Sequence, residues 1–334
     1  MALIAVVVES DRLLRRVGCA AFLMLGVRCY EADDPIGAAH LLRRLSFSVD
    51  VVVSACSLPR VTGLEFLVHF KSVDNISGIP FLVSVGCAEE AHLMRAVQEG
   101  ADALLMRPIG LLPLRRALCS LKALPLETDA SPSLLSLLPS ETASALMNGA
   151  SVRRIPEGSS LFISGSPPSQ LALLMEGRMK EGERIYSTGD AVALEAFLSS
   201  EKLDEDVVAM QDCRVALFSR SDVEALAVES PTFCRALAEA ITPPSTPPFQ
   251  APLVPLLARL HARCATGVVN CGRGTVKIHG GIISVIFHPN ADDPQEALAR
   301  MADEGSASFR PQQVPPEKTV DMSVCALLRR IAQL

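Results

Sequence analysis

Tryptophan is absent from this sequence of 334 residues, and tyrosine occurs only twice. Large aromatic side chains are the usual stacking platforms for single-stranded nucleic acid and common anchors of protein interfaces. The charge is also unfavourable for nucleic acid, because 31 Lys and Arg against 37 Asp and Glu leave a formal net charge of −6, which does not attract phosphate backbones. We therefore expect no nucleic acid among the partners.

Long apolar runs are missing too: no stretch reaches the ~18 uncharged apolar residues that a membrane-spanning helix needs. Residues Met1–Val8 are apolar but have no basic start and no cleavage pattern, and Glu9 follows directly, so they predict a buried strand rather than a signal peptide. The ten cysteines are scattered through apolar segments, which predicts reduced, buried thiols. We expect a cytoplasmic protein that does not contact a membrane.

Two proline-rich breaks divide the chain, at Leu124–Ser133 and at Thr242–Pro252. The second break has too many prolines for a helix or a central strand, and it predicts a stiff extended spacer. The length also favours several domains, at ~150 residues for an average domain. We expect three domains, comprising residues 1–123, 132–241 and 252–334.

The first domain alternates short apolar runs with segments of helical period. The expected strands are Leu3–Val8, Val27–Ala32, Val49–Val53, Phe81–Val85 and Ala103–Met106. The expected helices are Asp11–Leu25, Pro35–Leu45, Gly63–Ser72, Glu89–Glu99 and Leu111–Leu121. Five βα units predict an α/β doubly wound fold with a parallel sheet, whose ligand crevice lies at the carboxyl ends of the strands.

The second and third domains have a different pattern. After short helices at Pro132–Leu138 and Glu141–Met147, short strands punctuated by glycine predict a small antiparallel β-barrel or jelly roll, followed by helices from Ser221 and Pro231. These strands are Ser151–Ile155, Ser160–Ile163, Leu171–Glu176, Arg178–Glu181, Val207–Met210 and Val215–Ser219. The third domain is expected to be a small α+β unit. Its elements are Leu253–Ala262, Gly267–Asn270, Thr275–His279, Ile282–Phe287, Pro294–Met301, Ser306–Arg310 and Met322–Gln333.

Residues Leu3–Leu121 resemble a response-regulator receiver domain. The resemblance is carried by Pro59, Gly63, Glu99-Gly100-Ala101-Asp102 and Arg107-Pro108. In that family a phosphorylated aspartate ends the third strand, and the intervals to Pro59 and Gly63 place this acceptor at Ala55.

The resemblance implies a phosphoacceptor pocket that has lost its chemistry. Ala55 offers no carboxylate for an acyl phosphate. The acid pair that would hold Mg²⁺ is reduced to Glu9 and Ser10, and the hydroxyl position on the fourth strand falls on Val85. The cationic position is kept as Arg107.

Three further expectations concern this pocket. Ser84 lies beside the hydroxyl position but is expected to face the other side of the sheet, and the family's switch aromatic falls on Leu104. Asp11 is expected to cap the first helix. We also expect Arg107 to form a fixed ion pair with Glu9 in the emptied pocket.

Residues Leu134–Ile241 resemble the cyclic-nucleotide-binding domain of the cyclic-AMP receptor protein family. The matching motifs include Ile155-Pro156-Glu157-Gly158, Leu174-Met175-Glu176-Gly177-Arg178 and Gly189-Asp190. Ligand-binding members hold the cyclic phosphate with a glycine, a glutamate and an arginine near a short helix.

The nucleotide cassette of this chain departs from that pattern. It reads Ala193, Leu194 and Glu195, so the glycine is lost and the acid is displaced. Where the arginine belongs, the sequence has three carboxylates, which would repel a phosphate. These are Asp204, Glu205 and Asp206. We expect no cyclic AMP or GMP binding, and the proline-rich spacer replaces the family's DNA-binding helices.

The last domain resembles the PATAN-type domain, which implies a role in protein interaction. The resemblance is carried by residues 265–269, 274–285 and 305–309. A zinc reading of His261, Cys264, Cys271 and His279 is disfavoured because the spacing forms no Cys-x-x-Cys knuckle. Four arginine doublets are expected on solvated helix faces. They are Arg15-Arg16, Arg43-Arg44, Arg115-Arg116 and Arg329-Arg330.

These features predict a non-enzymatic bacterial signalling adaptor, an atypical response regulator of a two-component phosphorelay that acts without phosphorylation and needs no cofactor or metal. Its expected partners are other signalling proteins, and a homodimer is possible. The alternative is a ligand sensor whose barrel binds a nucleotide or another small molecule and passes the signal to the C-terminal domain. An enzyme is not expected, because no nucleophile–base pair or metal set is present in the sequence.

Overall fold

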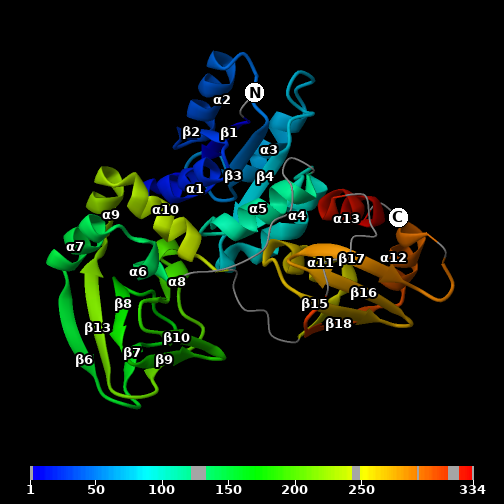
Figure 1. Cartoon of the computed structure of the whole chain (residues 1–334). Coiled ribbons are helices and arrows are strands. Elements are labelled where there is room, and N and C mark those ends of the chain that lie inside the picture. Colours follow the sequence, from blue (N-terminus) through cyan, green and yellow to red (C-terminus); the bar gives the residue numbers. More distant parts are fainter. Residues whose placement is uncertain (1–2, 122–132, 243–248, 292, 315–322, 333–334) are drawn as a thin grey trace.

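The computed structural model describes residues 3–121, 133–242, 249–291, 293–314 and 323–332. These residues form three units, each built on its own sheets (Figure 1). Most of the break at Leu124–Ser133 and residues 243–248 of the second break lie outside the described residues. Within them, no helix is both long and apolar enough to cross a bilayer.

The first unit contains a five-stranded parallel sheet of order β2-β1-β3-β4-β5, a doubly wound order. Its strands confirm the sequence expectation with small shifts at their ends. They are β1 Ile4–Val8, β2 Arg28–Ala32, β3 Val51–Ala55, β4 Phe81–Val85 and β5 Ala103–Met106. β3 and β4 are buried along their whole length, as their nearly continuous apolar sequences indicate.

Helices cover both faces of this sheet. Apolar residues of α1 and α5 form one core with one face of the sheet, and apolar residues of α2, α3 and α4 form a second core with the other face. Their bounds are α1 Arg12–Met24, α2 Pro35–Arg44, α3 Gly63–Lys71, α4 Leu93–Gln98 and α5 Leu111–Ser120. One expected helix is divided, because the chain after β4 first forms a 3₁₀ helix, η1 Cys87–His92, before α4 begins.

The second unit, called the barrel below after the sequence expectation, consists of two four-stranded antiparallel sheets, β10-β9-β12-β7 and β11-β8-β13-β6. The strands are β6 Ser151–Ile155, β7 Ser160–Phe162, β8 Gln170–Glu176, β9 Arg178–Glu181, β10 Arg184–Ser187, β11 Ala191–Val192, β12 Val207–Ala209 and β13 Cys213–Ser219. The helices are α6 Leu134–Leu137, α7 Ser140–Asn148, α8 Leu194–Ser199, α9 Arg220–Glu229 and α10 Pro231–Ala240. The sequence analysis did not predict β10, β11 or α8.

The third unit places three helices on one face of a five-stranded antiparallel sheet of order β14-β18-β15-β16-β17. Its elements are β14 Phe249–Pro252, α11 Leu253–Ala262, β15 Gly267–Cys271, β16 Gly274–His279, β17 Ile282–Phe287, α12 Pro294–Asp303, β18 Ser306–Pro311 and α13 Val324–Ala332. The expected spacer therefore ends earlier than predicted. Phe249–Pro252 is an edge strand paired with β18, a position in a sheet that tolerates proline.

The first unit lies between the other two (Figure 1). Helix α1 packs against α8, α9 and α10 of the barrel, while α11 and α13 of the third unit pack on α4 and β5. Each contact buries apolar side chains from both sides in one continuous core. The barrel and the third unit thus share the first unit as their common support.

Candidate functional site

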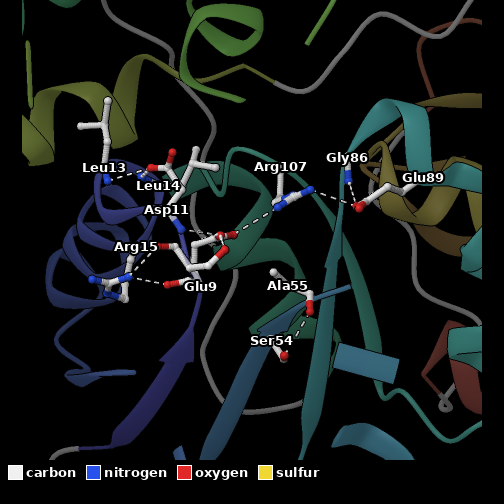
Figure 2. A network of polar contacts seen from close by, with 11 residues as sticks. Glu9, Asp11, Leu13, Leu14, Arg15, Ser54, Ala55, Gly86, Glu89 and Arg107 are labelled. Carbon is white, nitrogen blue, oxygen red and sulfur yellow. Dashed lines mark hydrogen bonds and ion pairs between the residues drawn. The ribbon is translucent and has the colours of Figure 1, made fainter. Parts of the chain in front are cut away.

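The candidate site lies at the carboxyl end of the parallel sheet. Glu9 directly follows β1, Ala55 ends β3, Gly86 follows β4 and Arg107 follows β5. Because parallel strands end at the same edge, their last residues converge there (Figure 2). The peptide bond between Arg107 and Pro108 is cis.

The Arg107 guanidinium is bound by two carboxylates of the first unit. Its Nη1 lies 3.4 Å from Glu9 Oε2, and its Nη2 lies 3.0 Å from Glu89 Oε2 (Figure 2). The first contact is the ion pair expected from the sequence. Glu89, from η1, was not predicted, although an acid four residues after a strand end of a parallel sheet is a signal that could have found it.

Hydrogen bonds fix both carboxylates. Glu9 Oε1 accepts the Asp11 N–H at 3.0 Å, and Glu89 Oε2 accepts the Gly86 N–H at 2.9 Å. Asp11 itself caps α1, as expected, with Oδ1 accepting the N–H groups of Leu13 and Leu14. The acidic residues that remain here are therefore already engaged within the protein.

Burial and the interactions within this cluster act on its pKa values in opposite directions. Burial raises the pKa of Glu9, and the nearby Arg107 only partly offsets that rise. Burial acts on Glu89 in the same direction, but hydrogen bonds from Gly86 and Ser57 and the charge of Arg107 lower its pKa overall. Burial also opposes the charge of Arg107, yet the carboxylates, Glu9 first, raise its pKa. Arg107 is a cation with its counterions in place.

The acceptor position holds only the buried methyl group of Ala55. Gly63, at the start of α3, is packed so closely that a Cβ atom there would overlap the Ala55 carbonyl oxygen. This contact agrees with the spacing that assigned the acceptor to position 55. The Ser10 hydroxyl lies 3.5 Å from Glu9 Oε1.

The two candidate positions on β4 face opposite sides of the sheet. Val85 packs with the core of α2, α3 and α4. Ser84 instead lines a cavity of about 10 Å³ shared with Val53, Glu9 and Arg107. A cavity of that size holds about one water, and Ala55 does not line it.

The nucleotide cassette of the barrel centres on a partly buried ion pair. Glu195, in the first turn of α8, lies 2.9 and 3.3 Å from the two Nη atoms of Arg184 on β10. Glu195 Oε1 also accepts the N–H and the hydroxyl of Thr242, both at 2.9 Å. Ala193, before buried Leu194, has a φ of +51°, a left-handed conformation that favours glycine.

The three carboxylates expected in the cassette make separate contacts in the structure. Asp206 accepts the Ser164 N–H at 2.8 Å, Glu205 lies over the turn at Gly182, and Asp204 is exposed. A cation, Arg184, stands beside Glu195 where the sequence suggested only acids. The sequence analysis missed it because it lies on an unpredicted strand.

Side chains fill the interior of the barrel. Tyr186 is among the largest fully buried side chains, with Leu174, Met179, Val215 and Leu217 buried in the same core. The Arg184 guanidinium stacks on the Tyr186 ring, 4.7 Å from its centroid. Burial raises the pKa of Tyr186, so the phenol is neutral.

The residues considered as zinc ligands make separate hydrogen bonds. His261 Nε2 accepts the Leu104 N–H at 3.4 Å, and its Nδ1 pairs with the Gly281 carbonyl at 2.9 Å. Cys271 Sγ donates to the Met301 carbonyl, and His279 pairs with the Val314 carbonyl. Across the described part of the chain, no group of three metal-ligating side chains assembles.

The cysteines and arginine doublets complete the comparison with the sequence. The nine cysteines with described side chains form no disulfide, and eight are buried, as expected.

The arginine doublets differ from expectation, because three of the four place one member at a contact between units. Arg16 donates to the Ala227 carbonyl, Arg116 to the Cys264 carbonyl, and Arg329 lies 3.7 Å from Asp102.

Comparison with known proteins agrees with this geometry in the first unit. The chain is 26% identical over 103 residues to the Regulator of RpoS of Escherichia coli K12, covering 31% of this chain and 29% of that protein. It is 26% identical over 78 residues to the Chemotaxis protein CheY-3 of Vibrio cholerae, covering 23% of this chain and 58% of that protein. The first unit has a receiver-like fold.

The chain thus spans less than two thirds of the length of either relative. No family model matches it. Among solved structures, the match to the Catabolite Activator Protein of Thermus thermophilus covers 31% of this chain and 54% of that protein's chain, with 20% sequence identity and a TM-score of 0.29. At this level the likeness carries no function across.

Proposed function

We propose that this chain is a non-enzymatic signal-transduction adaptor whose receiver-like domain works without phosphorylation. The observation that carries the proposal is the occupied pocket: Ala55 has no carboxylate to accept a phosphoryl group, and Arg107 is paired with Glu9 and Glu89. Similarity to the Regulator of RpoS and to CheY-3 supports a place in signalling. The partners would be other signalling proteins, bound through protein surfaces.

The test of this proposal is phosphoryl transfer itself. The full chain is incubated with a small-molecule acyl phosphate and Mg²⁺, beside a receiver domain that retains its acceptor aspartate. We expect no mass increment on this chain, and no amide shifts near Ala55 on adding beryllofluoride and Mg²⁺. A stable phosphorylated species, or beryllofluoride shifts around Ala55 and Arg107, would refute it.

We further propose that the barrel does not act as a cyclic-nucleotide sensor. The filled interior around Tyr186 and the use of Glu195 by Arg184 and Thr242 support this. A ligand that binds only the folded state raises stability by RT ln(1 + [L]/Kd). Thermal unfolding with millimolar cyclic AMP or cyclic GMP is expected to show no increase in Tm, and a saturable increase would restore the sensor alternative.

A further inference from the structure

The two degenerate sites meet at one residue of the barrel. Glu201 follows α8 by two residues and reaches across to the first unit. Its carboxylate lies against the Cα of Gly86 so closely that a Cβ atom there would overlap Glu201 Oε1, and would also lie 3.3 Å from Arg107 Nη2. The charge of Glu201 contributes to raising the pKa of Arg107. The barrel thus places a third carboxylate beside this guanidinium.

The barrel holds Glu201 at a fixed position. The Arg220 side chain closes the end of α8, since its Nη2 donates to the carbonyl of Phe197 and, at 2.8 Å, to the hydroxyl of Ser200. The same guanidinium stacks on the Phe197 ring, 4.8 Å from its centroid. A displacement of α8 therefore displaces Glu201.

On the other side of the contact, the first unit leads directly to the third. Gly86 donates its N–H to Glu89, which binds Arg107 and belongs to η1. The chain continues from η1 into α4, and α4 packs against both α11 and α13. One short series of contacts therefore joins the cassette of the barrel to two helices of the third unit.

We propose that the contact of Glu201 with Gly86 and Arg107 couples the barrel to the third unit. A shift of α8 is passed through Gly86 and Glu89 to α4, and from there to α11 and α13. In this proposal the degenerate pocket transmits a movement of the barrel to the third unit, through a carboxylate of the barrel at the edge of the pocket. The test measures this coupling directly. It does not depend on whether the pocket accepts a phosphoryl group.

The test is amide hydrogen exchange of the full chain carrying Glu201→Gln, which keeps the size of the side chain and removes its charge. A second variant, Gly86→Ala, pushes the carboxylate away by steric overlap. Each has a matched control. Glu176→Gln removes a carboxylate paired with Arg214 elsewhere on the barrel, and Gly78→Ala adds a methyl group where no heavy atom lies within 4 Å.

We expect Glu201→Gln and Gly86→Ala to accelerate exchange about threefold in residues 87–98 and again in 253–262 and 324–332, a change of the size that loss of a partly exposed charge interaction brings. The two controls should leave these segments as in the unmodified chain. Should Glu201→Gln change exchange only within the barrel, or nowhere, the coupling is absent. Equal acceleration by Glu176→Gln would also overturn the proposal, since the effect would then be one of charge alone.

Discussion

A guanidinium held away from bulk water requires counterions. In this pocket Arg107 has them from two places in its own domain, Glu9 after β1 and Glu89 in η1. Removing one partner of a buried ion pair costs far more than the pair itself contributes, because the remaining charge is left in a poor solvent. The cluster is therefore maintained by the cost of breaking it.

Gly63 is a residue whose substitution tests the packing behind the acceptor position. Its Cβ would overlap the Ala55 carbonyl oxygen, so Gly63→Ala is expected to destabilise the protein by about 1–3 kcal/mol, a usual cost of overpacking. Urea unfolding of both variants measures it, with Gly78→Ala as the control, expected within about 0.5 kcal/mol of the unmodified chain. Equal stability of the two variants would contradict the packing described.

Glu195 carries a prediction about pH. Burial raises the pKa of this carboxyl, but Arg184 and the hydrogen bonds from Thr242 more than offset it, so the folded-state pKa is lowered below the usual 4.5. A lowered carboxyl pKa stabilises the fold above the unfolded-state value, and this contribution is lost as the pH falls through the folded-state value. We expect Glu195→Gln to cost about 2 kcal/mol at neutral pH.

The cost should shrink as the pH falls below 4.5, because the unmodified chain then loses the same charge. Denaturant unfolding of both proteins across this range measures it. Glu296→Gln is the matched control, since it removes a half-exposed carboxylate from an i, i+4 pair with Arg300 and should cost under about 0.5 kcal/mol. A cost for Glu195→Gln that is independent of pH would show that the carboxylate charge is not what stabilises the cassette.

Sequence reasoning found the residues that spacing along the chain determines. The resemblance to a receiver domain implied Ala55, through the intervals to Pro59 and Gly63, and the pairing of Glu9 with Arg107. The parallel sheet brings these strand ends together. Glu89 and Arg184 were missed, because only the folded chain shows which of many charged residues each cation or acid meets. Arg16 shows the same limit, since a basic residue on a helix face looks solvated until another domain covers it.

At the scale of elements, α11 protects an edge of the parallel sheet. β5 is the last strand of that sheet, and α11 packs on it with His261 accepting the Leu104 N–H. An edge strand leaves such donors without partners unless another element covers them. The position expected for the switch aromatic, Leu104, is thereby buried beneath the third unit.

His261 makes this cover sensitive to acid. Burial lowers its pKa below the usual 6.5, although the hydrogen bond with Gly281 acts against the shift. A lowered histidine pKa stabilises the fold above 6.5, and the contribution is lost as the pH falls further. We expect His261→Gln, which can keep both hydrogen bonds but does not titrate, to lose less stability than the unmodified chain between about pH 7.5 and about pH 5.5.

Denaturant unfolding at several pH values in this range measures the two slopes. The other five histidines remain in both proteins, so the difference between the slopes reports His261 alone. If the stability of the two proteins changed with pH in the same way, folding would not favour the neutral form of the His261 ring, and the prediction would be wrong.

Nearly continuous apolar runs were predictable, whereas several short elements without such a pattern were not. β3 and β4 are nearly continuous apolar runs, and β4 was predicted with its bounds correct. β10 is four residues long and buries only Tyr186, so no alternation identifies it. β14 ends in Pro252, and only its pairing with β18 makes it a strand. Tertiary contacts decide such segments, not their local sequence.

At the scale of the molecule, the cores are shared across the units. Apolar residues of α1 and α5 lie in one core with the barrel helices, and those of α4 and β5 lie in another with α11 and α13. We therefore expect the full chain to unfold in one cooperative transition by calorimetry. A fragment of residues 1–123 should expose the apolar surfaces that the other two units cover in the full chain. We expect it to bind the dye ANS and to lose most of its near-ultraviolet circular dichroism.

The full chain under the same conditions is the control for the fragment. If the fragment unfolds cooperatively with the stability it has in the full chain, or if calorimetry resolves three independent transitions, the units are neighbours rather than one structure.

The cover over β5 has a consequence for how partners are recognised. With that side closed, β2 is the one remaining open border of the parallel sheet among the described residues. Arg28 and Glu31 stand exposed on it, and charges of this kind discourage a foreign strand from lining up. We therefore expect a protein that binds this unit to contact its helices and loops. Its specificity would come from side-chain contacts rather than from backbone hydrogen bonds of an added strand.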